Sequence, residues 1–360
     1  MQTVTIAAMA MVLVGCGNAA TGGSDGGADL AVAMDLAVPD LSLHLSAVDL
    51  AFGTDTDGGV TCTPPPTASV AKYVWNAVTL PMQRTDYAFD LNGDGRSDNQ
   101  YGNIVGALAG QGLDPQAAAT QSITSGQSLT LLDEQAGDPT FTTATCAVTT
   151  TYAGLAMASP DFSGGGQFMI DPAATVGHFF GPIAAARFTS EPPPANAKVP
   201  SLARINLALF GATPVDIIGA RITYLRGANG SVTGGQLNGA IRQYDIDHTV
   251  VPALAATWNA QVQANPSSST SMQLLAIFDN GGAADAACGG TCKNLDGSCA
   301  VAHDNVISDC EVGTAGLIKN VLAPDVQMFD DAGNYHPQAA NTKKDSLSIG
   351  LAFTAVPATF

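Results

Sequence analysis

Short runs of apolar, aromatic and β-branched residues, separated by turn residues, dominate the chain after residue 67. Such runs are typical of strands. The predicted strands cover residues 73–80, 128–132, 140–152, 167–170, 184–189, 204–210, 217–225, 272–278 and 346–356. Most of the chain is therefore predicted to be a β-rich body with many turns.

Helical signals are fewer. Val250, Leu254, Trp258 and Val262 are spaced to line one face of a helix over 249–264. Shorter helices are predicted over 99–109, 115–123 and 313–322, the second with Asp114 as its cap. These elements predict an α+β fold over 68–360: one β-rich antiparallel sheet or sandwich with a few short helices.

The N-terminal residues have a different pattern. Residues 3–14 are apolar and uncharged, and this run is shorter than the ~20 residues that span a bilayer. It ends in Leu13-Val14-Gly15-Cys16, which resembles the lipobox of bacterial lipoproteins. The resemblance implies a signal peptide over 1–15 and a lipid on the Cys16 thiol. No Lys or Arg precedes Cys16, unlike in that family, and an ordinary signal peptide is the alternative.

Residues 16–67 read as an acidic tether. This stretch has no Lys or Arg, and aspartates recur through it, several of them followed by Leu. A segment of this kind cannot bury enough apolar area to offset the entropy of ordering it. We therefore expect it to be disordered and to hold the folded domain away from a membrane. The alternative is a segment that folds on a partner.

Charge narrows the range of partners. The chain has 31 acidic and 13 basic residues, for a formal net charge of −18. Nucleic-acid binding depends on Lys and Arg contacts to phosphate, so this balance argues against it. An acidic surface suits calcium and a saline exterior.

The cysteines point to an oxidising compartment. Six remain besides Cys16: Cys62, Cys146, Cys288, Cys292, Cys299 and Cys310. An even number in an exported chain predicts disulfides. The last four lie close in sequence and are expected to pair among themselves in one of three ways, which leaves Cys62 with Cys146. Zinc is the alternative, although the spacings do not form two close ligand pairs.

The segment 90–101 has the pattern of a calcium loop. Its expected ligands are the side chains of Asp90, Asn92, Asp94 and Asp98 and the carbonyl of Arg96. Alternate oxygens around a glycine turn resemble the loops of EF-hands, dockerins and integrin-type propellers, which implies a Ca²⁺ site. Tyr101 stands where an EF-hand has its bidentate Glu, so the resemblance is closest to the shorter propeller-type loop. A plain turn is the alternative.

A weaker candidate covers 279–311. It resembles the second half of an EF-hand loop, with Asp304, the carbonyl of Val306 and Glu311 as ligands and Asn305 at the turn position. Asp279 would begin the loop, and the cysteine-rich stretch would be inserted between. The alternative is a disulfide-braced loop that binds no metal.

No catalytic motif is found in the sequence. The histidines form no pair with metal spacing, and Gly22-Gly23-Ser24-Asp25-Gly26 lies in the tether, where a nucleophile elbow is not expected. The chain resembles uncharacterised bacterial surface lipoproteins with an acidic tether and EF-hand-like loops.

Together the patterns predict a lipid-anchored, exported calcium-binding protein, on the outer-membrane, periplasmic or cell-surface side. It would serve as a surface binding or structural module, with the membrane and a protein or glycan ligand as partners. The alternative is a secreted hydrolase of glycan or peptide, with structural calcium and an aromatic floor formed by Trp75 or Trp258.

Overall fold

The computed structural model of the chain describes Cys62, Pro65 and residues 67–157, 159–172, 177–197, 203–206, 214–315 and 319–360. The predicted signal peptide, Cys16 and nearly all of the predicted tether lie outside these residues. Within them, the structure forms one compact unit.

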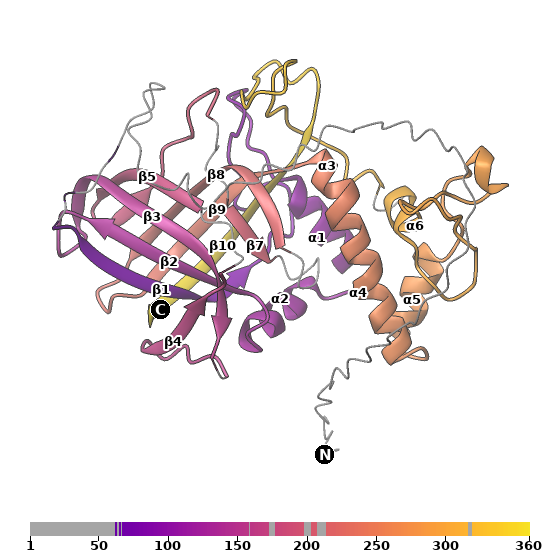
Figure 1. Ribbon diagram of the computed structural model, residues 1–360, viewed down its shortest axis with the longest axis horizontal. Helices are drawn as coiled ribbons and strands as arrows, with labels where there is room; N and C mark the ends of the chain where they lie inside the picture. The colour runs from indigo at the N-terminus through magenta and orange to yellow at the C-terminus, as the bar shows by residue number, and fades with distance from the viewer. Residues whose placement is uncertain are drawn as a thin grey trace, which may run out of the picture. The chain divides into compact units, whose positions relative to one another are not determined.

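Eight antiparallel strands close into a barrel (Figure 1). In barrel order they are β1 (Ser69–Thr79), β2 (Leu129–Ala136), β3 (Thr143–Ala156), β5 (Gly177–Ala184), β6 (Arg187–Thr189), β8 (Pro214–Arg226), β9 (Val232–Arg242) and β10 (Ser346–Thr359). β10 pairs back with β1, with Tyr73 opposite Pro357 and Thr79 opposite Ala352. Two further strands join this sheet: β4 (Gly166–Ile170) pairs with β3 and β10, and β7 (Ala203–Asn206) pairs with β8.

The predicted α+β sheet or sandwich is therefore wrong. The barrel is closed by the pairing of the first and last strands of the domain, β1 and β10, and by β3 with β5. Local sequence patterns identify strands but do not state their partners, so closure could not be predicted from them.

Strand β9 was not predicted, because glycines interrupt its apolar pattern. A Cβ on Gly235 would lie 2.6 Å from the ring of Phe353, and one on Gly239 would lie 2.4 Å from the side chain of Ile217. These glycines allow bulky side chains of other elements to reach the backbone of β9. The predicted strand 184–189 covers β6 and only the last residue of β5, which begins at Gly177 and was otherwise not predicted; the two strands join at Ala185 and Ala186.

The barrel interior is filled by side chains. Tyr73, Trp75, Phe188, Tyr224 and Phe353 belong to one buried cluster, in which Trp75 stacks on Phe353 with ring centroids 4.1 Å apart. Dense packing of this kind is expected for an eight-stranded barrel.

Two helices after β1 extend this core, and both were predicted. Helix α1 (Gln100–Gly110) packs against β10, and α2 (Pro115–Thr124) packs against β1. The carboxylate of Asp114 accepts the N–H of Ala117 at 2.8 Å, as expected of the cap.

The later helices are α3 (Gln243–Asp245), the π-helix η2 (Ile246–Val250), α4 (Val251–Ala264), α5 (Ser269–Phe278), the 3₁₀ helix η3 (Ala286–Cys288) and α6 (Asp309–Thr314). Helix α4 confirms the prediction over 249–264. The predicted strand 272–278 is wrong, because this stretch belongs to α5. Ser268 caps α5, and Leu274 and Phe278, one turn apart, are buried. Helix α6 begins before the helix predicted over 313–322 and shares only Gly313 and Thr314 with it. Residues 316–318 of that prediction lie outside the described residues, and Lys319 is helical.

Candidate metal centre

The 90–98 loop is clamped at its base. Phe89 and Asp98 form a β-bridge, in which the N–H of Asp98 donates to the carbonyl of Phe89 at 2.8 Å. Leu91 is buried in a small apolar cluster with Met328 and Tyr335 of the C-terminal segment. Helix α1 begins at Gln100, so the chain that leaves the loop is held in a helix.

The turn inside the loop uses the expected residues. Gly93 and Gly95 have φ values of +79° and +81°, which residues with a side chain rarely adopt. Their N–H groups donate to the two carboxylate oxygens of Asp90 at 2.7 and 3.0 Å. Asp94 accepts the N–H of Arg96 at 2.8 Å. The loop thus curls around its own acidic side chains.

Three carboxylates converge as a result. Oxygens of Asp90, Asp94 and Asp98 lie within 4.8 Å of one another. Across the described ranges, no other group of three His, Cys, Asp or Glu side chains could hold one ion. Asn92 is 4% exposed, and its Nδ2 atom has no hydrogen-bond partner.

Asp98 is the most buried of the three acids, with a side chain that is 3% exposed, and other carboxylates lie close to it. Burial, with the nearby carboxylates of Asp325 and Asp94, raises the pKa of Asp98 to about 6, against the opposing effects of the Leu91 N–H and of Arg84. A divalent cation would relieve this repulsion, and a hard cation prefers such oxygens, so the donor set fits calcium. Tyr101 is fully buried and cannot complete the shell, as expected from its residue type.

The loop is also tied to the barrel. The side chain of Asn99 accepts the N–H of Gly350 on β10 and donates to its carbonyl, both at 3.0 Å. The N–H of Gln100 donates to Ser348 Oγ at 2.7 Å. Sequence reasoning missed these partners, and no local signal marks them, because they come from the last strand.

In the 279–311 loop, the predicted first residue, Asp279, lies beside the predicted second half of the loop. Asp279 accepts the N–H groups of Asp304 and Asn305 at 3.2 and 2.9 Å. Asn305 has φ +66°, the left-handed conformation expected at the turn. Asp304 accepts the N–H of Val306 at 2.9 Å.

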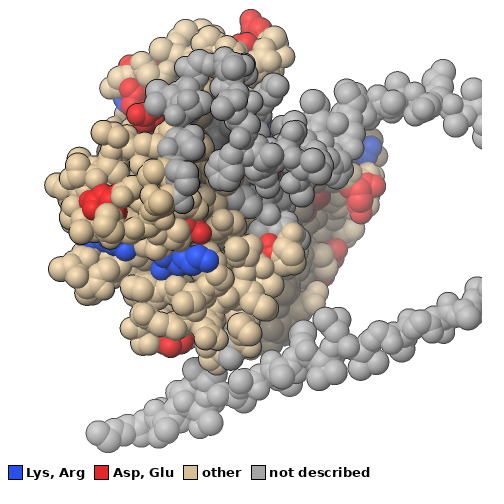
Figure 2. Space-filling model, turned by 60° about the vertical axis from the view of Figure 1, so that its left-hand side comes forward, with Lys and Arg blue, Asp and Glu red and all other residues tan. Residues whose placement is uncertain are grey.

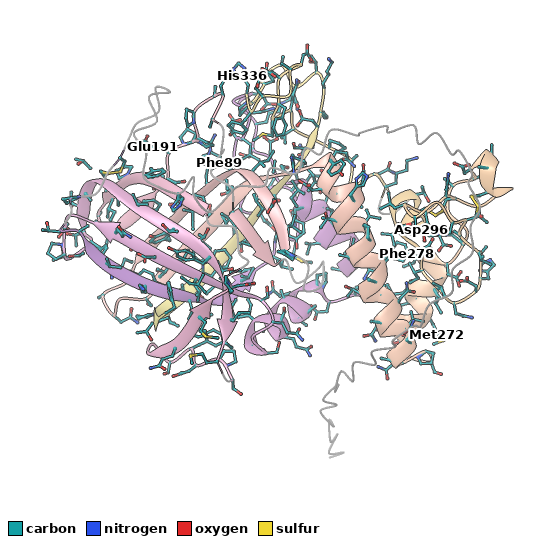
Figure 3. All side chains as sticks on the ribbon, viewed as in Figure 1. Phe89, Glu191, Met272, Phe278, Asp296 and His336 are labelled. Atoms are coloured by element: carbon teal, nitrogen blue, oxygen red, sulfur yellow. A yellow bond between two sulfur atoms is a disulfide. The ribbon has the colours of Figure 1, made fainter. Side chains whose placement is uncertain are left out.

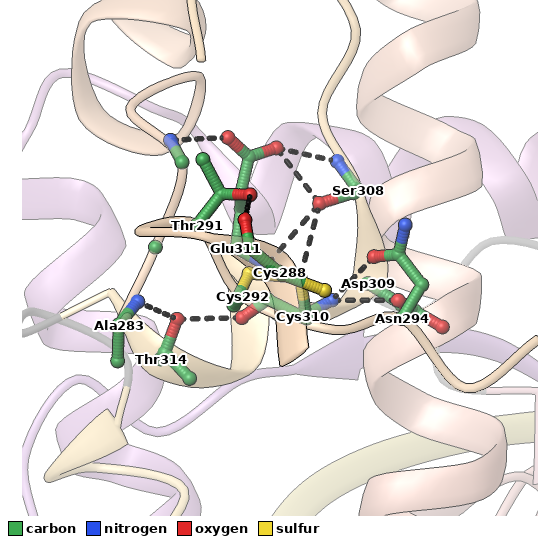
Figure 4. The surroundings of a disulfide bond; sticks show 12 residues. Ala283, Cys288, Thr291, Cys292, Asn294, Ser308, Asp309, Cys310, Glu311 and Thr314 are labelled. Carbon is green, nitrogen blue, oxygen red and sulfur yellow. Dashed lines mark hydrogen bonds between the residues drawn. A yellow bond between two sulfur atoms is a disulfide. The ribbon is translucent and has the colours of Figure 1, made fainter. Parts of the chain in front are cut away.

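Glu311 is fully buried and already hydrogen-bonded (Figure 4). One oxygen accepts the N–H of Gly281 at 2.7 Å, and the other accepts the N–H and hydroxyl of Ser308 at 2.9 and 2.8 Å. Here Glu311 completes the capping box of α6. The carbonyl and N–H of Ile307 exchange hydrogen bonds with the Asn259 side chain on α4.

All six predicted disulfide cysteines are paired. Cys62 bonds to Cys146, which confirms the prediction. The quartet pairs as Cys288–Cys299 and Cys292–Cys310, one of the three possibilities. The second bridge joins the loop after α5 to the first turn of α6 (Figure 4). With all six thiols in disulfides, the zinc alternative is excluded.

The tryptophans do not form a binding floor. Trp75 is 3% exposed inside the barrel, and Trp258 is buried against Phe278, with ring centroids 4.4 Å apart. Both belong to the main hydrophobic core.

Comparison with known proteins finds no matching family model, no similar curated protein and no similar solved structure. No helix within the described residues is long and apolar enough to cross a membrane.

Proposed function

We propose that this protein binds calcium through the 90–98 loop and works as an exported, lipid-anchored surface module without catalysis. The ligands are the side chains of Asp90, Asn92, Asp94 and Asp98 and the carbonyl of Arg96. Water completes the shell, because Tyr101 cannot contribute.

The convergence of three carboxylates supports this proposal most strongly. Asp90, Asp94 and Asp98 gather within 4.8 Å on a turn that two glycines allow. With five protein oxygens and no bidentate acid, we expect an affinity of ~0.1–1 mM, typical of extracellular modules. The three disulfides, which form in oxidising compartments, support an extracytoplasmic location.

The described part of the structure, which includes both tryptophans, lacks the exposed tryptophan that the hydrolase alternative requires. An aromatic floor would need Trp75 or Trp258 at the surface, and both are packed in the core. No arrangement among the described residues favours that alternative over a binding or structural role.

Calcium titration calorimetry tests the metal site. Wild-type protein should bind calcium in the sub-millimolar to millimolar range, and an Asp90→Asn, Asp94→Asn double variant should not. Asp330→Asn is a matched control, because Asp330 accepts the N–H groups of Ala332 and Asn334 in a similar exposed turn. Equal calcium binding by the wild type and the double variant would refute the proposal.

Metabolic labelling with palmitate tests the anchor. Wild-type protein expressed in a bacterial host should be labelled, and a Cys16→Ser variant should not. Equal labelling of both proteins would show that Cys16 carries no lipid.

A further inference from the structure

We propose that Arg84 and Arg221 are internal counter-ions of the 90–98 loop: they neutralise part of its charge in the metal-free protein and thereby lower its calcium affinity. This inference rests on the proposed calcium site and explains how that site could be tuned.

Arg84 lies beside Asp98. Its Nη2 atom is 3.8 Å from Asp98 Oδ1 and 3.2 Å from Asp325 Oδ2. Both carboxylates are buried, whereas the Arg84 side chain is 46% exposed. The guanidinium therefore bridges a loop carboxylate and an acid from the C-terminal segment.

The chain around Arg84 is held in place by helix α1. A Cβ on Gly102 would lie 2.1 Å from the carbonyl of Gln83, and one on Gly106 would lie 2.5 Å from the carbonyl of Met82. Asp86 also accepts the N–H groups of Met82 and Gln83, at 2.9 and 3.0 Å. These contacts place the backbone before Arg84 against helix α1.

Arg221, on β8, lies against the residue that directly precedes the loop. Its guanidinium carbon is 4.6 Å from the centre of the Phe89 ring. Phe89, which Figure 3 labels, directly precedes the loop. Arg221 Nε is buried without a hydrogen-bond partner. Burial lowers the pKa of Arg221, and Tyr335 and Asp90 act in the opposite direction. The Arg221 guanidinium thus lies over Phe89, the residue directly before Asp90.

The two arginines change the energetics of metal entry. In the metal-free protein each guanidinium offsets the repulsion among the three carboxylates. When calcium enters, the same two positive charges repel it. Both effects weaken binding. When calcium binds Asp98, Arg84 can still pair with Asp325. Calcium can therefore replace Arg84 as the counter-ion of Asp98 without leaving Arg84 unpaired.

Figure 2 shows that charged side chains are sparse on the face it presents. Only 12% of the residues are charged. Because exposed charges more than ~8 Å away are largely screened at physiological salt, the two arginines near the loop should outweigh distant charges.

Calcium titration of charge variants tests the inference. Arg84→Gln and Arg221→Met should each bind calcium three- to tenfold more tightly than wild type, measured by calorimetry in 0.15 M KCl. Arg84→Lys keeps the charge and should stay within twofold of wild type. Arg187→Gln removes an exposed charge on β6, and its affinity should also change less than twofold. Urea unfolding of each variant verifies that it is folded.

Unchanged or weaker calcium binding by both folded variants Arg84→Gln and Arg221→Met would overturn the counter-ion role. The calcium site itself would still stand if the wild type bound and the Asp90→Asn, Asp94→Asn variant did not. If the wild type bound no calcium at all, both proposals would fail together. A smaller difference between Arg84→Gln and wild type in 1 M KCl would support an electrostatic cause.

Discussion

In the 90–98 loop the carboxylates of Asp90, Asp94 and Asp98 lie within 4.8 Å of one another, and those of Asp90 and Asp94 also accept backbone N–H groups. In the 279–311 loop Asp279 and Glu311 accept backbone N–H groups and belong to no such group of three acids among the described residues. Both stretches resemble calcium loops in sequence. In the first, repulsion among the acids remains after the loop has folded. In the second, hydrogen bonds from the chain itself satisfy the buried acids.

This difference shows what decides whether a buried acid is available to a metal. Burying a carboxylate is costly unless donors or a cation compensate it. Glu311 receives three hydrogen bonds from Gly281 and Ser308, so a cation there would have to displace existing donors. Asp98 receives one long hydrogen bond, from the Leu91 N–H at 3.4 Å, and stays close to other acids. Only the first loop would gain much from a cation.

The largest expected effect comes from removing the Glu311 carboxylate. Glu311→Ala would leave the buried N–H of Gly281 and the cap of α6 without an acceptor. We expect a loss of about 3–5 kcal/mol in the free energy of unfolding, measured with urea in EDTA. Glu311→Gln should lose less, because its amide oxygen can still accept. If Glu311→Gln instead removed one equivalent of bound calcium, Glu311 would be a calcium ligand, and the inferred difference between the two loops would be wrong.

Calcium should stabilise the protein through the first loop. At 10 mM calcium and the expected affinity, the gain in the free energy of unfolding is about 1–3 kcal/mol. Asp94→Asn should remove most of this gain, and Asp304→Asn should leave it unchanged. Thermal unfolding with calcium and with EDTA measures both. An equal loss in the two variants would place calcium in both loops.

The pH dependence sharpens the comparison in metal-free protein. The pKa of Asp98 is raised from 3.8 to about 6, so between these values the folded state binds more protons than the unfolded state. The contribution of Asp98 to stability is therefore largest below pH 4 and falls as pH rises through 6, by about 3 kcal/mol. Asp98→Asn should flatten this part of the profile in urea unfolding from pH 3.5 to 7.5. A variant profile parallel to wild type would contradict the assignment.

The smallest effects concern the turns. Gly95→Ala should cost about 1 kcal/mol from backbone strain alone, because Gly95 has φ +81° and open space around its Cα. Asn305→Gly, at φ +66°, should change stability by only a few tenths of a kcal/mol. Thermal unfolding in EDTA measures both. A larger effect of Asn305→Gly would mean that its side chain does more than tolerate the turn.

Some of the site could be predicted because its signal is local. The structure has three such local features in place: the Asp90–Asp98 spacing, the Asp114 cap and the left-handed Asn305. The Cys62–Cys146 bridge is not local, and it could be predicted only because the other four cysteines lie close together in sequence. Arg84, Arg221 and Asp325 could not be assigned to the loop. Arg221 and Asp325 lie far from the loop in sequence, whereas Arg84 lies shortly before it. No local pattern marks any of the three as a neighbour of the loop carboxylates.

The same holds for the fold. Helix α5 resembled a strand because its apolar run is short, and the Ser268 cap decided otherwise. Strand β9 was hidden by glycines whose reason lies in the side chains of Phe353 and Ile217 on other elements.

The sequence by itself determined most of the strands and helices, the oxygen-rich loop and the even set of cysteines, because these follow from short-range patterns. Only the tertiary structure decided that β1 pairs with β10 to close a barrel and that Glu311 is satisfied by N–H groups. It also placed Arg84 between Asp98 and Asp325. Those outcomes depend on contacts between residues far apart in the chain. Strand pairing, burial and charge at such contacts depend on both partners at once, so no local pattern predicts them.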